Sequence, residues 1–144
     1  MFVDASAIVA ILTREADADA LADALEVAEG PITSSIAVFE AVAGICRKHH
    51  ASVAEAQADV RDFLAAARVV VVPISQGDGD AALAAFARYG KGRGHPAQLN
   101  MGDCLAYGVA KSQDCALLFK GDDFGKTDIR RAIAAYCPSL YGLA

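Results

Sequence analysis

The stretch MFVDASAIVAILT, residues 1–13, establishes the pattern that the rest of the chain repeats. Residues 1–3 are a short apolar run that predicts a β-strand ending at Asp4. Residues 6–13 then place apolar side chains at the spacing of a short helix. The opening residues therefore predict a strand that passes into a helix, with a carboxylate at the junction.

Helical and extended patterns alternate along the remaining chain. Helices are expected over residues 17–28, 36–48, 53–67, 79–89 and 101–113. Extended segments are expected at residues 32–33, 69–74 and 115–119. The β-branched run of residues 69–74 predicts a strand buried on both faces, and residues 129–136 fit either a short helix or an edge strand. This alternation predicts a single α/β domain over residues 1–144, with a central parallel sheet flanked by helices.

Composition limits the classes of protein to which the chain can belong. Hydrophobic residues make up 55% of the 144 residues, enough for a core without disulfides or structural metals. The four cysteines have no metal-binding spacing, and the adjacent His49 and His50 make a poor metal pair. The N-terminus lacks the basic start of a signal peptide, and the apolar run 69–72 is too short to cross a bilayer. We therefore expect a soluble cytoplasmic protein without a membrane partner.

The net charge of −5 argues at first against a nucleic-acid partner. The basic residues nevertheless gather in short groups, namely Arg47 and Lys48, Lys91 and Arg93, Lys120 and Lys126, and Arg130 and Arg131. Lys91 and Arg93 lie in the glycine-rich segment 90–96, for which two interpretations stay open. It is either a simple flexible loop or a mobile basic loop that contacts RNA phosphates.

Aspartates occur where an α/β fold builds its binding sites. Ligands bind at the carboxyl ends of parallel strands. Asp4 follows the first predicted strand, and Asp122 and Asp123 follow the strand 115–119. Asp103 lies in the first turn of the helix that precedes this last strand. Each of these aspartates also has an ordinary explanation as a helix cap or a turn residue.

Glu40 lacks such an explanation, because it lies in an apolar helical stretch with no Lys or Arg within four residues. Burial of an unpaired carboxylate is costly, and a bound cation would offset that cost. Converging carboxylates repel one another unless a metal neutralises them, and oxygen ligands suit Mg²⁺ or Mn²⁺. Such a metal activates water for attack on phosphorus, so the residues predict hydrolysis of phosphodiester bonds.

Four segments of the chain resemble, in the same order, the PIN domain of VapC-type toxins from bacterial toxin–antitoxin pairs. They are FVDASAIVAIL at residues 2–12, SSIAVFEAV at 34–42, LNMGDCLAYGVAK at 99–111 and LLFKGDDFGKTDI at 117–129. The resemblance runs nearly end to end. It implies a PIN-like fold, Mg²⁺-dependent endoribonuclease activity in which Mn²⁺ can substitute, a homodimer, and inhibition by a VapB-type antitoxin.

The resemblance also implies which residues form the site. The positions that correspond to the acidic quartet, as catalytic residues and metal ligands, are Asp4, Glu40, Asp103 and Asp122. Ser6 corresponds to a small polar residue that neighbours this site. The pair Asp122-Asp123 departs from the spacing of many PIN domains, so either residue could face the metal. We favour Asp122 and give Asp123 a supporting role in the turn.

Two other functions compete with the nuclease. A PIN-like binding module without activity is disfavoured because all four acidic positions carry carboxylates. A phosphoryl-transfer domain would use Asp4 as its nucleophile. A phosphatase of the dehalogenase type would carry a second aspartate two residues later, where this chain has Ser6. The favoured prediction is therefore a metal-dependent ribonuclease.

Overall fold

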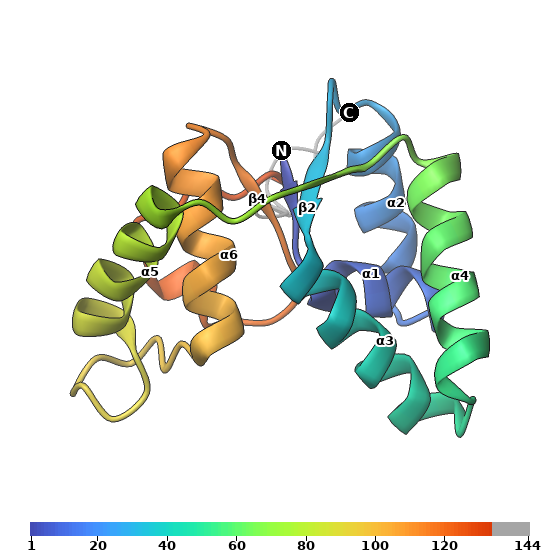
Figure 1. Ribbon diagram of the computed structural model, residues 1–144, viewed down its shortest axis with the longest axis horizontal. Coiled ribbons are helices and arrows are strands. Elements are labelled where there is room, and N and C mark those ends of the chain that lie inside the picture. The colour runs from blue at the N-terminus through green and yellow to red at the C-terminus, as the bar shows by residue number, and fades with distance from the viewer. Residues whose placement is uncertain (134–144) are drawn as a thin grey trace, which may run out of the picture.

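The computed structural model describes residues 1–133 and has a four-stranded sheet with helices on both sides (Figure 1). The strands are β1 (Phe2–Val3), β2 (Ile32–Ser34), β3 (Val70–Val72) and β4 (Leu117–Leu118). Their order across the sheet is β3-β2-β1-β4, and every pairing is parallel. The predicted parallel α/β architecture is confirmed.

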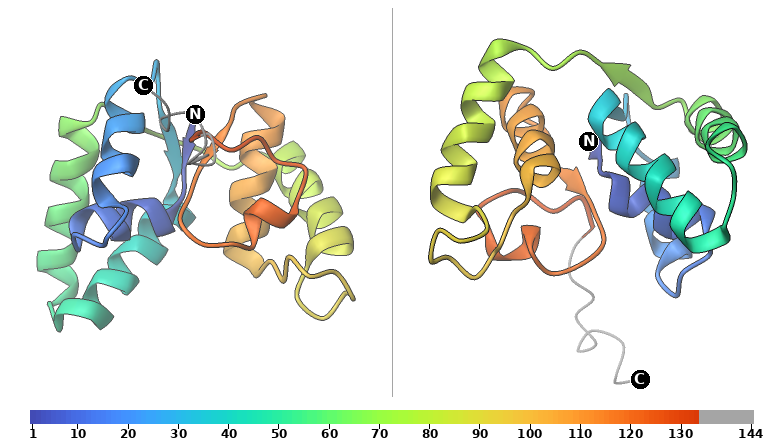
Figure 2. Two further views of the ribbon diagram at one scale, coloured as in Figure 1. Left: turned by 180° about the vertical axis from the view of Figure 1, so that it is seen from behind. Right: turned by 60° about the horizontal axis from the view of Figure 1, so that its bottom comes forward.

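Six α-helices surround this sheet in the described part of the chain. They are α1 (Ala5–Leu12), α2 (Ala18–Glu26), α3 (Ser35–His49), α4 (Val53–Ala66), α5 (Gln76–Tyr89) and α6 (Met101–Ser112). Helices α1 to α4 lie on one side of the sheet, and α5 and α6 lie together on the other (Figures 1 and 2). None of these helices is both long and apolar enough to cross a membrane.

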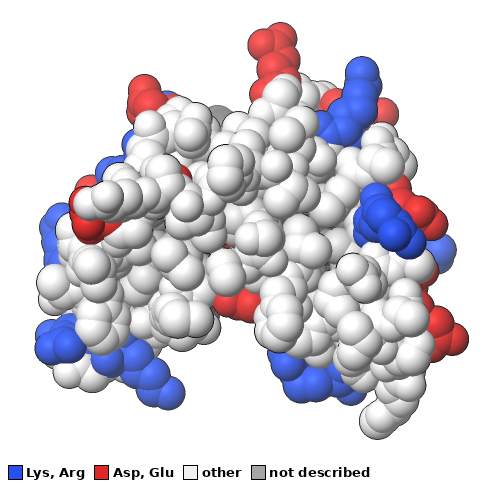
Figure 3. Space-filling model, in the orientation of Figure 1, with Lys and Arg blue, Asp and Glu red and all other residues white. Residues whose placement is uncertain are grey.

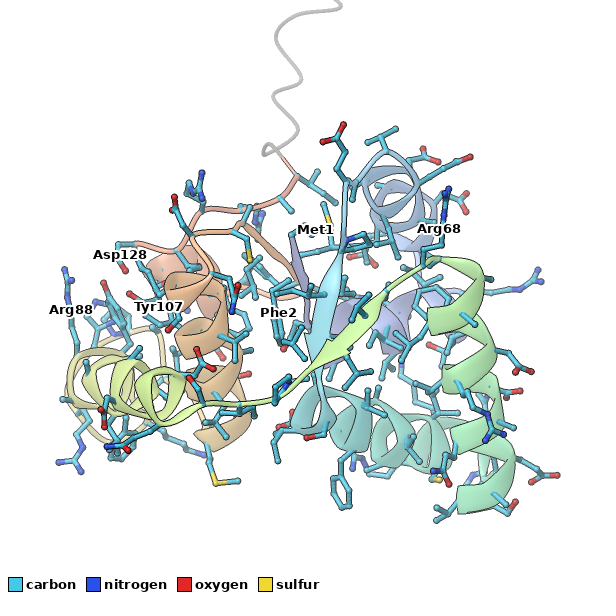
Figure 4. All side chains as sticks on the ribbon, turned by 45° about the horizontal axis from the view of Figure 1, so that its top comes forward. Met1, Phe2, Arg68, Arg88, Tyr107 and Asp128 are labelled. Atoms are coloured by element: carbon cyan, nitrogen blue, oxygen red, sulfur yellow. The ribbon has the colours of Figure 1, made fainter. Side chains whose placement is uncertain are left out.

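The central strand β1 carries the core of the molecule. Phe2 and Val3 are fully buried, because β2 and β4 flank them and helices cover both faces. Figure 4 shows Phe2 at the centre of the side chains that fill the space between the sheet and α6. This packing fixes Asp4, the next residue, at the carboxyl end of the central strand.

The chain after β4 is tied to α6 by a polar cluster. The Tyr107 hydroxyl donates to Oδ1 of Asp128 at 2.5 Å, and the Tyr89 hydroxyl donates to the same atom at 3.1 Å. Lys111 forms an ion pair with Asp128 at 3.2 Å, and Figure 4 shows Tyr107 and Asp128 at the same end of the molecule. These bonds hold the pKa of Asp128 at about 2, and they anchor the segment that begins with Asp122 and Asp123.

The predicted burial of residues 69–74 on both faces is wrong. Strand β3 has three residues and lies at the edge of the sheet, where Val70 is 58% exposed and Val71 is 47% exposed. A β-branched run favours an extended backbone, but the neighbours of a strand depend on the topology of the whole chain.

Two further boundaries differ from the sequence prediction. Helix α5 begins at Gln76, ahead of the expected start at residue 79, because Ser75 and Asp78 form a capping box there. In the segment 129–136, Arg131 makes an isolated parallel bridge to Leu117, and residues 129–133 form neither a helix nor a strand. The rest of that segment, from residue 134, lies outside the described residues.

Candidate active site

Asp4 lies at the carboxyl end of β1 and caps the first turn of α1. Its side chain is buried, and Oδ2 accepts bonds from the Ser6 amide at 3.0 Å and the Ser6 hydroxyl at 2.5 Å. The Ser6 hydroxyl oxygen accepts the backbone N–H of Lys120 at 3.0 Å. Ser6 therefore connects Asp4 to the segment that follows β4. Burial raises the pKa of the Asp4 carboxyl, and the bonds from Ser6 oppose this effect.

Asp103 lies at the N-terminus of α6, where it forms a capping box with Asn100. Asn100 Oδ1 accepts the Asp103 N–H at 2.8 Å, and Asp103 Oδ2 accepts the Asn100 N–H at 3.0 Å. The pKa of Asp103 is raised to about 6, chiefly by burial and in smaller part by the carboxylates of Asp4, Glu40 and Asp123, while the bond from Asn100 lowers it. Asp103 thus both caps α6 and lies among other carboxylates.

Glu40 reaches from α3 to the first turn of α6. A Cβ atom added at Gly102 would overlap the Glu40 carboxylate, with even the farther oxygen, Oε2, only 2.9 Å away. Glu40 therefore lies directly against the residue that precedes Asp103. Burial and the charge of Asp4 raise the pKa of the Glu40 carboxyl, while Arg47 lowers it.

Asp4, Glu40 and Asp103 line one hollow of about 650 Å³. Its basic lining residues are Arg47, Lys48 and Lys120. Glu15 accepts ion pairs from both Lys48 and Lys120, so this carboxylate holds the two lysines at one edge of the hollow. Figure 3 shows acidic surface deep in the notch between the two halves of the molecule, with basic side chains on either side.

The two adjacent aspartates after β4 differ in position. Asp123 raises the pKa of Asp103, so its carboxylate lies within electrostatic reach of that residue. Asp122 instead lines two other hollows, together with Phe119 and Arg131. Neither aspartate lines the hollow of Asp4, and Asp123 pairs with Lys126 at 3.8 Å, but Asp123 is the one of the two whose charge acts on Asp103.

The basic residues Lys91 and Arg93 lie in the exposed connection between α5 and α6. The Arg93 guanidinium stacks over the ring of Phe86, 4.5 Å from its centroid. Neither residue is among those described as lining the hollow of Asp4. Contact of this loop with RNA would thus lie outside the hollow.

The donor set of the hollow suits a hard cation. No three His, Cys, Asp or Glu side chains of residues 1–133 stand close enough to hold a metal ion in their present positions. Three carboxylates with raised pKa values nevertheless line one hollow, and a bound cation would offset the repulsion between their ionised forms. Oxygen donors of this kind fit Mg²⁺ or Mn²⁺ rather than a softer metal.

Comparisons with known proteins identify the family. Residues 1–130 match the model of the PIN domain. A VapC ribonuclease of Rhizobium meliloti (strain 1021) is 42% identical over 140 residues, covering 89% of this chain and 98% of that protein. Ribonuclease VapC28 of Mycobacterium tuberculosis is 40% identical over 133 residues, covering 92% of this chain and 98% of its own. The chain belongs to the VapC family of PIN-domain proteins.

Solved structures agree on the fold of this VapC-family chain. The crystal structure of Mycobacterium tuberculosis VapC20, described as a sarcin-ricin loop cleaving toxin, superposes with a TM-score of 0.67 at 14% identity, covering 89% of this chain and 95% of that one. A toxin–antitoxin complex from Klebsiella pneumoniae gives a TM-score of 0.61 at 18% identity, covering 85% and 88% of the two chains.

Two residues near the hollow of this PIN domain were missed by the sequence reasoning. Glu15 lies in the turn after α1, and its role depends on lysines that are distant in sequence. Gly102 could have been noticed in the sequence, because glycine in the first turn of a helix lowers the helix propensity. Its position beside Asp103 points to a steric requirement at this site.

Proposed function

We propose that this VapC-family protein is a Mg²⁺-dependent endoribonuclease, the toxin of a VapBC pair that acts in the cytoplasm. The observation that carries the proposal is the single hollow that Asp4, Glu40 and Asp103 line together, each with a raised pKa. Groups with this degree of mutual repulsion and burial are typical of functional sites. The names of the relatives, which are VapC ribonucleases, support RNA as the substrate.

Asp4, Glu40 and Asp103 would hold the metal, with Asp123 in the fourth position in place of Asp122. Bound Mg²⁺, or Mn²⁺ in its place, would supply a water of lowered pKa and offset charge on phosphate oxygens. Ser6 and Asn100 fix the carboxylates of Asp4 and Asp103 through their Oδ2 atoms. The ligands are therefore oriented by the protein itself, which limits the reorganisation that binding requires.

The basic residues around the hollow support a polyanionic substrate. Arg47, Lys48 and Lys120 line the same hollow as the carboxylates and can contact phosphates on either side of the cleaved bond. Lys91 and Arg93 would contact RNA farther along its backbone. Phosphate contacts of this kind make RNA affinity fall as the salt concentration rises.

The proposed partners are a VapB-type antitoxin and a second copy of the chain. The likeness to a toxin–antitoxin complex supports the antitoxin. An apolar hollow of about 560 Å³ between α5 and α6 supports the homodimer, because Leu83 and Met101 line it and are 66% and 72% exposed.

Sedimentation should then show a dimer that Leu83→Glu dissociates, while Val27→Glu, at an exposed site beyond α2, leaves it intact. A wild-type monomer at micromolar concentration would rule out this interface.

Cleavage of a structured RNA pool by purified, antitoxin-free protein tests the enzymatic function. Wild-type protein with Mg²⁺ is expected to produce specific cuts, which excess EDTA, the Asp4→Asn substitution or the cognate VapB-type protein abolishes. Asp59→Asn, an exposed aspartate on α4, is the matched control and should cut normally. Cuts that persist in EDTA would contradict metal dependence. Folded protein that binds Mg²⁺ and cuts nothing would favour the binding module.

A further inference from the structure

Gly102 is a glycine in a place where the backbone does not require one. It is the second residue of α6, it is buried, and its φ angle lies outside the left-handed region. Alanine is the better helix former at such a position. The absence of a side chain at Gly102 therefore needs an explanation from the surroundings of the helix.

The atoms nearest to an added Cβ at Gly102 belong to a single side chain. The three heavy atoms nearest to an added Cβ are the carboxylate carbon and the two carboxylate oxygens of Glu40. The contrast with Gly108 in the same helix is clear, because a Cβ there would meet the backbone of α5, including the amide nitrogen of Ala82 at 2.9 Å. Gly108 thus permits helix packing, whereas Gly102 makes room for one carboxylate.

We infer that Gly102 is a positioning residue, whose missing side chain lets the Glu40 carboxylate lie against the first turn of α6 beside Asp103. The N-terminal end of a helix carries partial positive charge, which favours a carboxylate at this place. The helix end and the charge of Arg47 both favour the Glu40 carboxylate, although no Lys or Arg lies within four residues of it in the sequence. The consequence for metal binding rests on the proposed function.

The consequence of a methyl group at this position follows from what it would displace. The clashing atoms are the end of a flexible side chain, so Glu40 can turn away while the helix stays intact. Gly102→Ala is then expected to fold and to lose affinity for Mn²⁺ by about tenfold or more, the usual effect of disturbing the support of a metal ligand. Gly79→Ala adds a methyl in the first turn of α5 with no heavy atom within 4 Å, and it should leave Mn²⁺ affinity unchanged.

A double-mutant cycle with Glu40→Ala separates positioning from a general structural effect. Mn²⁺ affinity by calorimetry and metal-free unfolding temperature are measured for the wild type, Gly102→Ala, Glu40→Ala and the double variant. We expect Gly102→Ala to weaken Mn²⁺ binding only when Glu40 is present, and to be better tolerated in unfolding when Glu40 is absent. Equal effects of Gly102→Ala in the two backgrounds would overturn the inference.

The unfolding measurements without metal distinguish a failure of this inference from a failure of the proposed function. If the wild type binds no Mn²⁺, the proposed metal site fails, and the unfolding temperatures still decide whether Gly102 and Glu40 are coupled. If Gly102→Ala does not fold, the double variant decides. Folding restored by Glu40→Ala supports the inference, and failure of both variants to fold overturns it.

Discussion

The surroundings of Asp103 act on its ionisation in opposite directions. Its Oδ2 atom accepts the Asn100 N–H and completes the cap of α6. Burial, together with the charges of Asp4, Glu40 and Asp123, raises its pKa to about 6. The ionised form that a metal requires is therefore disfavoured in the metal-free protein, and the free energy of unfolding is lower as a result.

Removal of this charge should stabilise the metal-free protein. The shift from 3.8 to about 6 corresponds to at most about 3 kcal/mol at neutral pH. Solvent screening and the loss of a favourable charge at the helix N-terminus reduce it, so we expect Asp103→Asn to gain about 1 to 2 kcal/mol. Urea unfolding at pH 7 in EDTA measures this gain, with Asp59→Asn as the control. A less stable Asp103→Asn would mean that the cap outweighs the repulsion.

The neighbouring residues Asp122 and Asp123 should differ in their effect on the site. Asp123→Asn is expected to weaken Mn²⁺ binding by about tenfold and to lower the pKa of Asp103, because a nearby negative charge is lost. Asp122→Asn is expected to change neither quantity, since its side chain lines other hollows. Calorimetry with Mn²⁺ and NMR titration of the Asp103 carboxyl compare the two variants. The opposite ranking would restore the assignment favoured from the sequence.

Individual residues show which parts of the candidate site could be predicted from the sequence. Glu40 was identified because a carboxylate in an apolar helix without a basic neighbour needs an explanation, and the structure places it in the same hollow as Asp4 and Asp103. Asp122 and Asp123 could not be told apart, because the direction of adjacent turn residues depends on the short 3-10 helix Phe124–Lys126 that follows them. Distances between such residues are set by tertiary packing, which the hydrophobic periodicity of the sequence does not predict.

Secondary structure elements were predicted best where local chemistry decides them. Ser52 and Asn100 begin α4 and α6 as expected, because each forms a capping box with the acidic residue three positions later. The start of α5 was missed because two glycines, Gly77 and Gly79, hid the same box at Ser75. The position of β3 at the sheet edge depends on the order of the strands, which is a property of the whole fold.

The two capping boxes of α4 and α6 allow a matched experiment at the scale of elements. Asn100→Ala and Ser52→Ala should each cost about 1 kcal/mol in the free energy of unfolding, the usual loss for an N-cap. Only Asn100→Ala removes the partner of Asp103, so it alone should also weaken Mn²⁺ binding and slow cleavage of RNA. Chemical unfolding and Mn²⁺ calorimetry on both variants check this. Equal Mn²⁺ affinity in the two variants would show that the cap does not orient Asp103.

In the whole molecule, the topology gathers residues that are distant in the chain. Strand β1 carries Asp4 to the end of the sheet, α3 brings Glu40 from one side, and α6 brings Asp103 from the other (Figure 1). The hollow therefore lies in the notch between the two groups of helices, where Figure 3 shows acidic surface between basic side chains. Because these carboxylates lie in one hollow, their ionised forms repel one another, and stability is expected to depend on pH.

Stability of the metal-free protein should fall as the pH rises from about 4 to 6. The pKa of Asp103 is about 6 in the folded protein and 3.8 as its ordinary value, so the unfolded chain ionises first over this range. Asp4 and Glu40 have raised pKa values and act in the same direction. Asp128, with its pKa lowered to about 2, contributes stability that grows with pH and levels off only above its ordinary value of 3.8, and the lowered pKa values of Asp78 and Glu55 act in the same direction as Asp128, so they oppose the fall at the start of this range.

At the proposed site, Mg²⁺ would bind the ionised carboxylates of the folded state in competition with protons, and it should therefore reverse this trend. At a concentration of one hundred times Kd the metal adds about 2.7 kcal/mol. The unfolding temperature with Mg²⁺ should therefore separate from that in EDTA progressively between pH 4 and 6, and cleavage of RNA should rise over the same range. Asp103→Asn should flatten both dependences. If the unfolding temperature depends on pH in the same way with and without Mg²⁺, these carboxylates do not share a cation. The repulsion among them would then require another explanation.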